Sequence, residues 1–453
     1  MEKQRENFGG RAAVIMAFAG SAIGLGNIWR FPYMVGENGG AAFILIYIAA
    51  TLLLSLPIFL AESVIGRRSG QNAIGAMKTL APGSGWRILG YLSILTPMII
   101  VSYYSVVGGW SLEYLWQACR LRFTAIPADV SSGLFNTFIT STWGPLACHT
   151  VFLLMGTVIV AAGVKSGIEK FCKVSIPILF VLVVLIMLYS LSLPGAGAGV
   201  QYLLKPDFSK LTPRACAAAL GQSFFSLSLG MGIIITYSSY IRRDENLLAS
   251  GVGTAVADLL FALLAGFAIM PAVFAGGIQP SAGPGLIFQT LPYIFTQMGI
   301  EMPVVSAVVA ILFFLTVLVA ALTSTVSLLE VGVAWLVEEK HLRRGWACWI
   351  IFGGTWLLGA LCSLSFGPLS RFQLGGKVLF DLLDLFSSNF LLILGGLLGV
   401  LFVGWKMPRS AVRDEFSNGG RLRGNARLFG AFYFILKYLA PLAILVIFVT
   451  NFL

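Results

Sequence analysis

The sequence predicts an all-α integral membrane protein with eleven transmembrane helices. Of its 453 residues, 58% are hydrophobic and only 11% are charged, and the mean hydropathy is +0.89. A soluble protein of this size could not cover its surface with so few charges. Apolar runs recur along the whole chain, and about 20 apolar residues suffice for a helix to cross a bilayer. The runs lack strand alternation, which argues against a β-barrel.

The eleven expected spans follow one another from the amino terminus. They lie near residues 11–34, 40–66, 88–118, 145–163, 168–191, 214–240, 247–277, 303–337, 346–364, 376–403 and 428–451. The chain then divides into a cytoplasmic tail (1–10), five spans (11–191), an extracellular loop (192–213), five more spans (214–403), a basic cytoplasmic loop (404–427) and a last span (428–453).

Basic residues predict the orientation of these spans. The formal net charge is +11, and Lys and Arg concentrate in alternate loops, as with Arg67 and Arg68 after span 2 and Arg242 and Arg243 after span 6. Because cytoplasmic loops carry this excess, we expect a cytoplasmic N-terminus and an extracellular C-terminus. The basic residues would then contact anionic membrane lipid. We expect no nucleic-acid partner and see no sign of an obligatory protein partner.

Two of the predicted spans contain interruptions. Span 1 contains GSAIGLGNIWRFP (20–32), and span 6 contains GQSFFSLSLGMG (221–232). Glycine permits non-helical dihedrals, and unwound backbone at membrane depth must be buried in protein or line a polar cavity. Since these spans open the first and second groups of five, the pattern predicts an inverted-repeat transporter with a site near the bilayer midplane. Close packing of unbroken, glycine-containing helices is the alternative interpretation.

These segments resemble the two unwound helices of the neurotransmitter:sodium symporter family, which has the LeuT fold. The resemblance covers essentially the whole chain and includes ALTSTVSLLE (321–330). It implies a 5+5 inverted repeat with unwound helices 1 and 6. It also implies a sodium-coupled symporter that imports neutral hydrophobic L-amino acids, aliphatic and aromatic, by alternating access. Eleven spans suit the bacterial branch, so a bacterial plasma (inner) membrane is expected.

The resemblance implies that two sodium ions bind. A hard cation prefers oxygen ligands, and unwound backbone exposes carbonyl groups that can supply them. The first site would combine the substrate carboxylate with Ala22, Asn27, Ser226 and Asp258. The second site would consist of Gly20, Ile23, Ala320, Thr323 and Ser324.

Asp258 departs from the animal members of the family, which carry asparagine at this position and bind chloride nearby. A carboxylate would supply the negative charge itself, so we do not expect chloride to be required. The other chloride-site positions are Tyr47, Gln222 and Ser226. Ionisable residues at membrane depth are functional candidates, although protonation or a helix partner could also neutralise Asp258.

The substrate site is expected beside the same two interruptions. The substrate carboxylate would face backbone amides near Gly24 to Gly26, at the positive end of a half-helix, and the hydroxyl of Tyr104. Monoamine transporters carry aspartate at the Gly24 position, so its absence favours a substrate with its own carboxylate, such as leucine, tryptophan or phenylalanine. The predicted site consists of Ala22, Ile23, Gly24, Leu25, Gly26, Ile100, Tyr104, Phe225, Ser226, Ser228, Met231, Ser324 and Leu328.

Charged residues near the ends of the spans resemble the gates of the family. Tyr104 and Phe225 would form an aromatic lid under the extracellular gate. Phe8 stands where the family has an N-terminal tryptophan, which leaves a plugging role open. The expected ion pairs are Arg30 with Asp384 on the extracellular side and Arg5 with Glu338 on the cytoplasmic side.

Two further residues have two interpretations each. Glu62 in span 2 could bond backbone amides at the interruptions or pack as a protonated acid. Pro177 in span 5 lies ten residues after Gly167. Because proline removes a helical hydrogen bond, it could produce a kink or mark a segment that unwinds.

Three alternatives to a sodium symporter remain. A channel or sensor could share the fold, and a related transporter could use protons. An intramembrane enzyme is disfavoured, because the sequence shows no nucleophile–base pair or metal cluster. The histidines His149 and His341 are far apart, and the six cysteines show no paired spacing.

Overall fold

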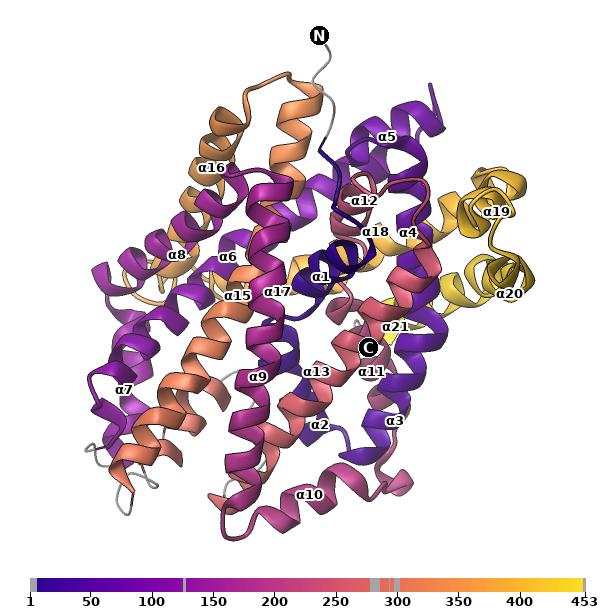
Figure 1. Ribbon diagram of the computed structural model, residues 1–453. Coiled ribbons are helices and arrows are strands. Elements are labelled where there is room, and N and C mark those ends of the chain that lie inside the picture. The colour runs from indigo at the N-terminus through magenta and orange to yellow at the C-terminus, as the bar shows by residue number, and fades with distance from the viewer. Residues whose placement is uncertain (1–5, 125–127, 278–285, 293, 297–301, 451–453) are drawn as a thin grey trace.

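The computed structural model in Figure 1 describes residues 6–124, 128–277, 286–292, 294–296 and 302–450. Within these residues the regular elements are helices, apart from an isolated bridge between Leu374 and Lys377. The described residues contain 9 helices that are long and apolar enough to cross a membrane, or up to 10 if one bent pair counts as a single span. The all-helical membrane fold is therefore confirmed.

The first part of the chain forms the helices that carry one half of the candidate site. Their bounds are α1 Arg11–Ala22, η1 Gly26–Arg30, α2 Phe31–Glu37, α3 Ala41–Ala50, η2 Thr51–Ser55, α4 Leu56–Ser69, α5 Ala73–Leu80, α6 Arg87–Cys119, η3 Arg122–Thr124, α7 Ala128–Thr140, α8 Trp143–Ala161, η4 Val164–Glu169, α9 Lys170–Ser192, α10 Ala196–Leu204 and η5 Phe208–Lys210.

The second part supplies the opposite half of the site and the final helices. Their bounds are α11 Pro213–Ser226, α12 Ile233–Ser238, α13 Leu247–Ala275, η6 Leu286–Thr290, α15 Pro303–Glu339, α16 Arg344–Leu364, α17 Leu379–Phe386, η7 Ser387–Leu391, α18 Leu392–Leu401, η8 Phe402–Lys406, α19 Arg409–Ser417, α20 Arg423–Phe434, η9 Ile435–Leu439 and α21 Ala440–Thr450.

Long spans form where consecutive helical segments continue without a break. The bounds of these spans agree with the expected ones to within several residues. They are Ala41–Ser69, Arg87–Cys119, Trp143–Ala161, Val164–Ser192, Leu247–Ala275, Pro303–Glu339, Arg344–Leu364, Leu379–Lys406 and Arg423–Thr450. The expected span at 214–240 is divided into α11 and α12, each of which is too short to meet the length of a crossing. The number eleven therefore stays a prediction.

The outer faces of the helices suit a lipid environment. Val158 of α8 is 60% exposed, and Val181 and Leu188 of α9 are 60% and 57% exposed. Exposed apolar patches of this kind mark contact with a partner or a membrane. The polar side chains of the candidate site lie instead in the protein interior, where α1 packs against α9, α13 and α15.

Candidate functional site

The helix of the first expected span is interrupted at its middle. Helix α1 ends at Ala22, Ile23 adopts an extended conformation with φ −77° and ψ 100°, and helical structure resumes by Gly26. The two halves of the span are bent by 54°. The side chain of Asn27 forms a hydrogen bond within the interruption, where its Oδ1 accepts from the Gly24 amide at 3.2 Å. Backbone carbonyls and amides near Gly24 are therefore free of regular helical pairing.

The second interruption separates α11 from α12. Ser228, Gly230 and Gly232 all have positive φ values, at 56°, 75° and 71°. Glycine adopts such angles without the steric penalty of a Cβ atom, which explains two of these three residues. The amide of Gly230 donates to Oε1 of Glu62 at 2.7 Å. Glu62 therefore bonds a backbone amide at the interruption, as one of its two sequence interpretations proposed.

Four helices bring a buried carboxylate together with three polar side chains. Asp258 of α13 accepts hydrogen bonds from Asn27 Nδ2 at 2.7 Å and from Ser226 Oγ at 2.8 Å. Tyr47 of α3 donates to Ser226 Oγ at 3.2 Å and to Asp258 Oδ2 at 3.4 Å. These four residues are all at most 2% exposed. The geometry therefore brings together the side chains predicted for the first sodium site and most of those at the chloride position.

Gln222 lies near this cluster and bonds a different partner. Its Nε2 donates to the Gly26 carbonyl at 3.1 Å, which joins α11 to η1. Its Oε1 is buried and has no hydrogen-bond partner among the described residues. Gln222 thus holds the two interrupted spans together, and its carbonyl oxygen is available to a further donor or cation.

The residues predicted for the second sodium site lie between α1 and α15. The hydroxyl of Thr323 is 3.2 Å from the Ile23 carbonyl and 2.9 Å from the Ala320 carbonyl. The Ser324 hydroxyl lies 3.4 Å from the carbonyl of Ser21. A Cβ added to Gly20 would lie 3.8 Å from Thr323 Cβ, so the α1 backbone runs close to α15 there. Several oxygens therefore converge at this point.

Replacing both Thr323 and Ser324 with alanine tests this assignment. If these hydroxyls ligate sodium, the double variant should need about tenfold more sodium for half-maximal uptake, because two neutral oxygen ligands are lost. Thr316 and Thr325 provide a matched control, since their buried hydroxyls bond carbonyls of their own helix, those of Leu312 and Ala321. An equal shift in the Thr316→Ala/Thr325→Ala variant would contradict the assignment.

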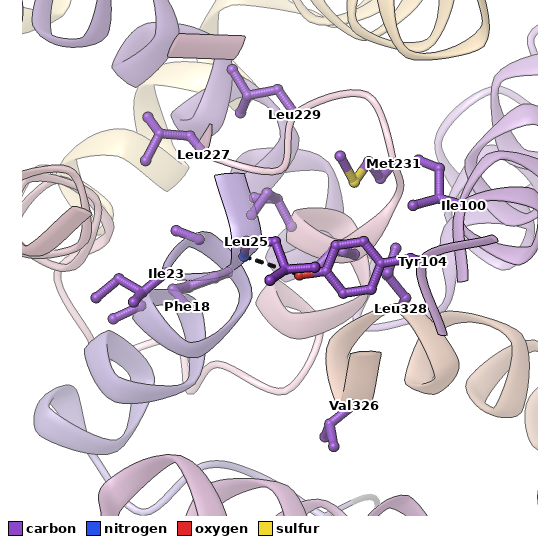
Figure 2. Packing of buried hydrophobic residues seen from close by; sticks show 14 of the residues in the cluster. Phe18, Ile23, Leu25, Ile100, Tyr104, Leu227, Leu229, Met231, Val326 and Leu328 are labelled. Carbon is purple, nitrogen blue, oxygen red and sulfur yellow. Dashed lines mark hydrogen bonds between the residues drawn. The ribbon is translucent and has the colours of Figure 1, made fainter. Parts of the chain in front are cut away.

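A narrow cavity lies between the two interruptions. Every residue predicted for the substrate site lines it except Ile23 and Leu25. Leu25 contributes its amide, which donates to the Tyr104 hydroxyl at 3.2 Å (Figure 2). Figure 2 also shows Ile100, Met231 and Leu328 gathered on the side of Tyr104 away from Ile23. The cavity thus has a polar end at the α1 interruption and an apolar end between α6, α12 and α15.

The sequence prediction missed two residues of this cavity, Ser21 and Ile233. The Ser21 carbonyl accepts a hydrogen bond from Ser228 Oγ at 2.9 Å, which links the two interruptions directly. The contact uses the backbone carbonyl of Ser21, which any residue carries, so the sequence holds no signal for it. Ile233 begins α12, and its apolar side chain carries no signal that separates it from ordinary core residues.

Phe225 separates this cavity from an outer one. It lines both the inner cavity and a second cavity of about 330 Å³. The guanidinium of Arg30 lies 4.7 Å above the Phe225 ring, as a cation–π contact. Within the described residues Arg30 and Asp384 form no ion pair, and Asp384 Oδ1 instead accepts from Ser388 at 3.1 Å. The extracellular ion pair and the aromatic lid therefore both stay predictions, and Phe225 lies between the two cavities.

The end of the site that the sequence predicts to face the cytoplasm has different contacts. Arg5 lies outside the described residues, and Glu338 accepts from the backbone and side-chain amides of Asn72 at 2.7 and 3.0 Å. Phe8 is only 2% exposed and packs edge-on against Tyr237 and Tyr240, at 5.7 and 5.9 Å between ring centroids. Phe8 therefore fills a buried position at this end.

The segment of span 5 that contains Pro177 is helical in this structure and belongs to α9. It is continuous from Lys170 to Ser192 with Pro177 inside it, and a π-helical turn at Val164–Glu169 precedes it. Glu6 caps that turn by accepting from the Val164 amide at 2.7 Å. Unwinding at this segment is not seen here.

Comparison with known proteins identifies the family. Residues 5–137 and 136–453 match the sodium:neurotransmitter symporter family. An uncharacterised sodium-dependent transporter of Bacillus subtilis (strain 168) is 39% identical over 99% of this chain and 98% of its own length. A sodium-dependent serotonin transporter of Drosophila melanogaster is 27% identical, covering 89% of this chain and 68% of its own length.

A solved structure has the same fold. The crystal structure of MhsT in complex with L-phenylalanine has a TM-score of 0.89 and is 41% identical in sequence, covering 99% of this chain and 100% of that chain. The helical membrane fold and the interior site thus define a multi-pass membrane transporter. The chain belongs to the sodium:neurotransmitter symporter family. It is a sodium-dependent transporter rather than an enzyme.

Proposed function

We propose that the chain imports neutral hydrophobic L-amino acids, aliphatic and aromatic, together with two sodium ions. The observation that carries this proposal is the composition of the inner cavity. Its described lining residues include no charged side chain, and Ile100, Met231 and Leu328 form one end of it. Burying a charged substrate side chain there would cost free energy without a compensating partner. The binding of L-phenylalanine by the similar protein MhsT supports the same substrate class.

The polar end of the cavity suits the carboxylate of an amino acid. The Leu25 amide and the Tyr104 hydroxyl lie 3.2 Å apart, so one carboxylate can accept from both groups. A Cβ at position 24 would lie 3.1 Å from this hydroxyl and 2.3 Å from Ser324 Oγ, so a fixed acidic side chain does not fit there without rearrangement. The substrate therefore supplies the anion, and that anion completes the first sodium site beside Asn27.

Alternating access requires that the cavity be closed on one side while it is open on the other. The Phe225 lid lies on the extracellular side of the cavity and Phe8 at the cytoplasmic end. We propose that the interrupted segments belong to spans 1 and 6 of an eleven-span, 5+5 inverted repeat in a bacterial plasma membrane, with the N-terminus in the cytoplasm and the C-terminus outside. In this arrangement the two sodium sites stabilise the half-helices while one closure opens at a time.

Substrate competition tests the role of the carboxylate. Tryptophan and leucine should compete for uptake, whereas tryptamine should compete at least about tenfold more weakly, because it leaves the amides near Gly24 without a charged acceptor. Glutamate and lysine should fail to compete, since their side-chain charges would be buried without partners. The measurement is displacement of labelled leucine in proteoliposomes. Equal displacement by tryptamine and tryptophan would contradict a shared carboxylate–sodium site.

A further inference from the structure

A basic cavity lies away from the transport site, on the side of the protein proposed to face the cytoplasm. It has no part in the proposed transport function. It is about 860 Å³ in volume and lies between helices α19 and α20. Figure 1 shows these two helices side by side at the edge of the molecule. The charged residues that line it are Arg409 and Arg413 of α19, Arg423 and Arg427 of α20, and Asp414.

The spacing of these arginines brings like charges together. The two arginines on each helix are four residues apart, so they lie on one face, and neighbouring like charges at this spacing are destabilising. Among the described residues none of the four arginines forms an ion pair. Arg409 lies over the rings of Phe429 and Tyr433, at 5.9 and 5.3 Å. One aspartate against four arginines leaves an excess positive charge that an anion would neutralise.

The same surface continues into lipid-exposed helix. Arg423 and Arg427 lie in the first turns of the long apolar helix Arg423–Thr450, which can cross a membrane. Phe434 follows Arg427 by seven residues, which is about two helical turns, so the two share a face. Phe434 is 54% exposed and Leu428 is 56% exposed. A ligand at this surface therefore meets guanidinium groups at one end and apolar side chains at the other.

We propose that this cavity binds the phosphate headgroup of an anionic phospholipid. Arginine pairs phosphate oxygens through two parallel hydrogen bonds, and each of the two helices supplies two arginines to the lining of the cavity. The acyl chains would lie along Phe434, which shares a face with Arg427. A small soluble anion would use the arginines and leave the apolar face unused, so the lipid is the better fit to both surfaces. Basic pockets on the cytoplasmic side of membrane helices commonly bind acidic headgroups.

The test uses the purified full-length chain in a neutral detergent. Phosphatidylglycerol is titrated against it, and binding is followed by native mass spectrometry and by the rise in thermal unfolding temperature. The Arg413→Gln/Arg427→Gln variant should bind phosphatidylglycerol about thirtyfold more weakly, because two cationic groups near the headgroup are lost. Both side chains are exposed, so the variant should fold, and an unchanged size-exclusion profile checks this.

A matched control separates a specific site from general attraction. The Arg87→Gln/Arg343→Gln variant removes the same charge from exposed positions outside the cavity and should bind as the natural chain does. The Arg413→Lys/Arg427→Lys variant keeps the charge and should recover part of the affinity. Equal weakening by the control variant would overturn the proposal. Equal binding of phosphatidylcholine, or displacement of the lipid by glycerol phosphate or inorganic phosphate at the same concentration, would also overturn it.

Discussion

Replacing Asp258 with asparagine is expected to raise the sodium concentration for half-maximal uptake by about a hundredfold. The carboxylate accepts hydrogen bonds from Asn27, Ser226 and Tyr47. An amide of the same shape removes the negative charge that faces the proposed sodium ion, and charge-assisted interactions of this kind contribute roughly 1.5–3 kcal/mol each. The measurement is sodium-dependent uptake of labelled leucine into proteoliposomes.

Chloride gives this experiment a second readout. If Asp258 supplies the charge that chloride provides in animal members of the family, the natural chain should transport in gluconate medium. The Asp258→Asn variant should gain a requirement for chloride. Asp381→Asn is the matched control, because Asp381 is an exposed residue at the start of α17. A natural chain that stops transporting without chloride, or a control that behaves like Asp258→Asn, would contradict the role of the carboxylate.

Replacing Gly230 with alanine is expected to destabilise the folded protein, because the backbone of the second interruption cannot accommodate the added methyl group. Gly230 has a φ of 75°, and a Cβ there would lie 2.2 Å from the carbonyl oxygen of Leu392. The left-handed conformation and the clash with backbone together should lower the free energy of unfolding by roughly 2–5 kcal/mol. We expect a lower thermal unfolding temperature in detergent and loss of uptake.

Gly221 provides the matched control within the same expected span. It lies in helix α11, and a Cβ there would meet only Ile447, at 3.9 Å, which is ordinary contact. Gly221→Ala should therefore leave the unfolding temperature unchanged or slightly raise it, since alanine favours helix over glycine. If Gly230→Ala folds and transports as well as Gly221→Ala does, the conformation assigned to the interruption is wrong.

The positions of the spans could be predicted because they depend on local composition. A run of about 20 apolar residues is sufficient evidence for a crossing helix, and the observed long helices begin and end near the expected residues. The expected span at 214–240 shows the limit of this length criterion. Its two helices, α11 and α12, are separated by residues of positive φ, and their length alone does not identify a crossing.

Contacts in the site depend on distances between helices, which the sequence does not contain. Asn27 and Asp258 are separated by 231 residues and yet share a hydrogen bond. Their proximity was expected only because the interrupted segments resemble a known family. Ile233 could not be recognised as a cavity residue, since its side chain is chemically the same as many in the core. The sequence likewise does not show which group Glu62 bonds, and the structure shows that it is the Gly230 amide.

Gate residues show a further limit of sequence reasoning. An ion pair between Arg30 and Asp384 depends on the conformational state, and a sequence does not select one state of a transport cycle. In this structure Arg30 lies over the Phe225 ring. Opening or closing of the outer cavity would change this contact without changing the residues involved.

We propose that sodium drives the uptake of hydrophobic amino acids by this protein. The most direct test is accumulation of labelled leucine in proteoliposomes containing only this protein, with an inward sodium gradient and no pH gradient. We expect internal leucine to rise above the external concentration and to fall again when an ionophore dissipates the sodium gradient. The recovered leucine should be chemically unchanged. Leucine that only equilibrates across the membrane, or that accumulates equally with choline in place of sodium, would contradict this proposal.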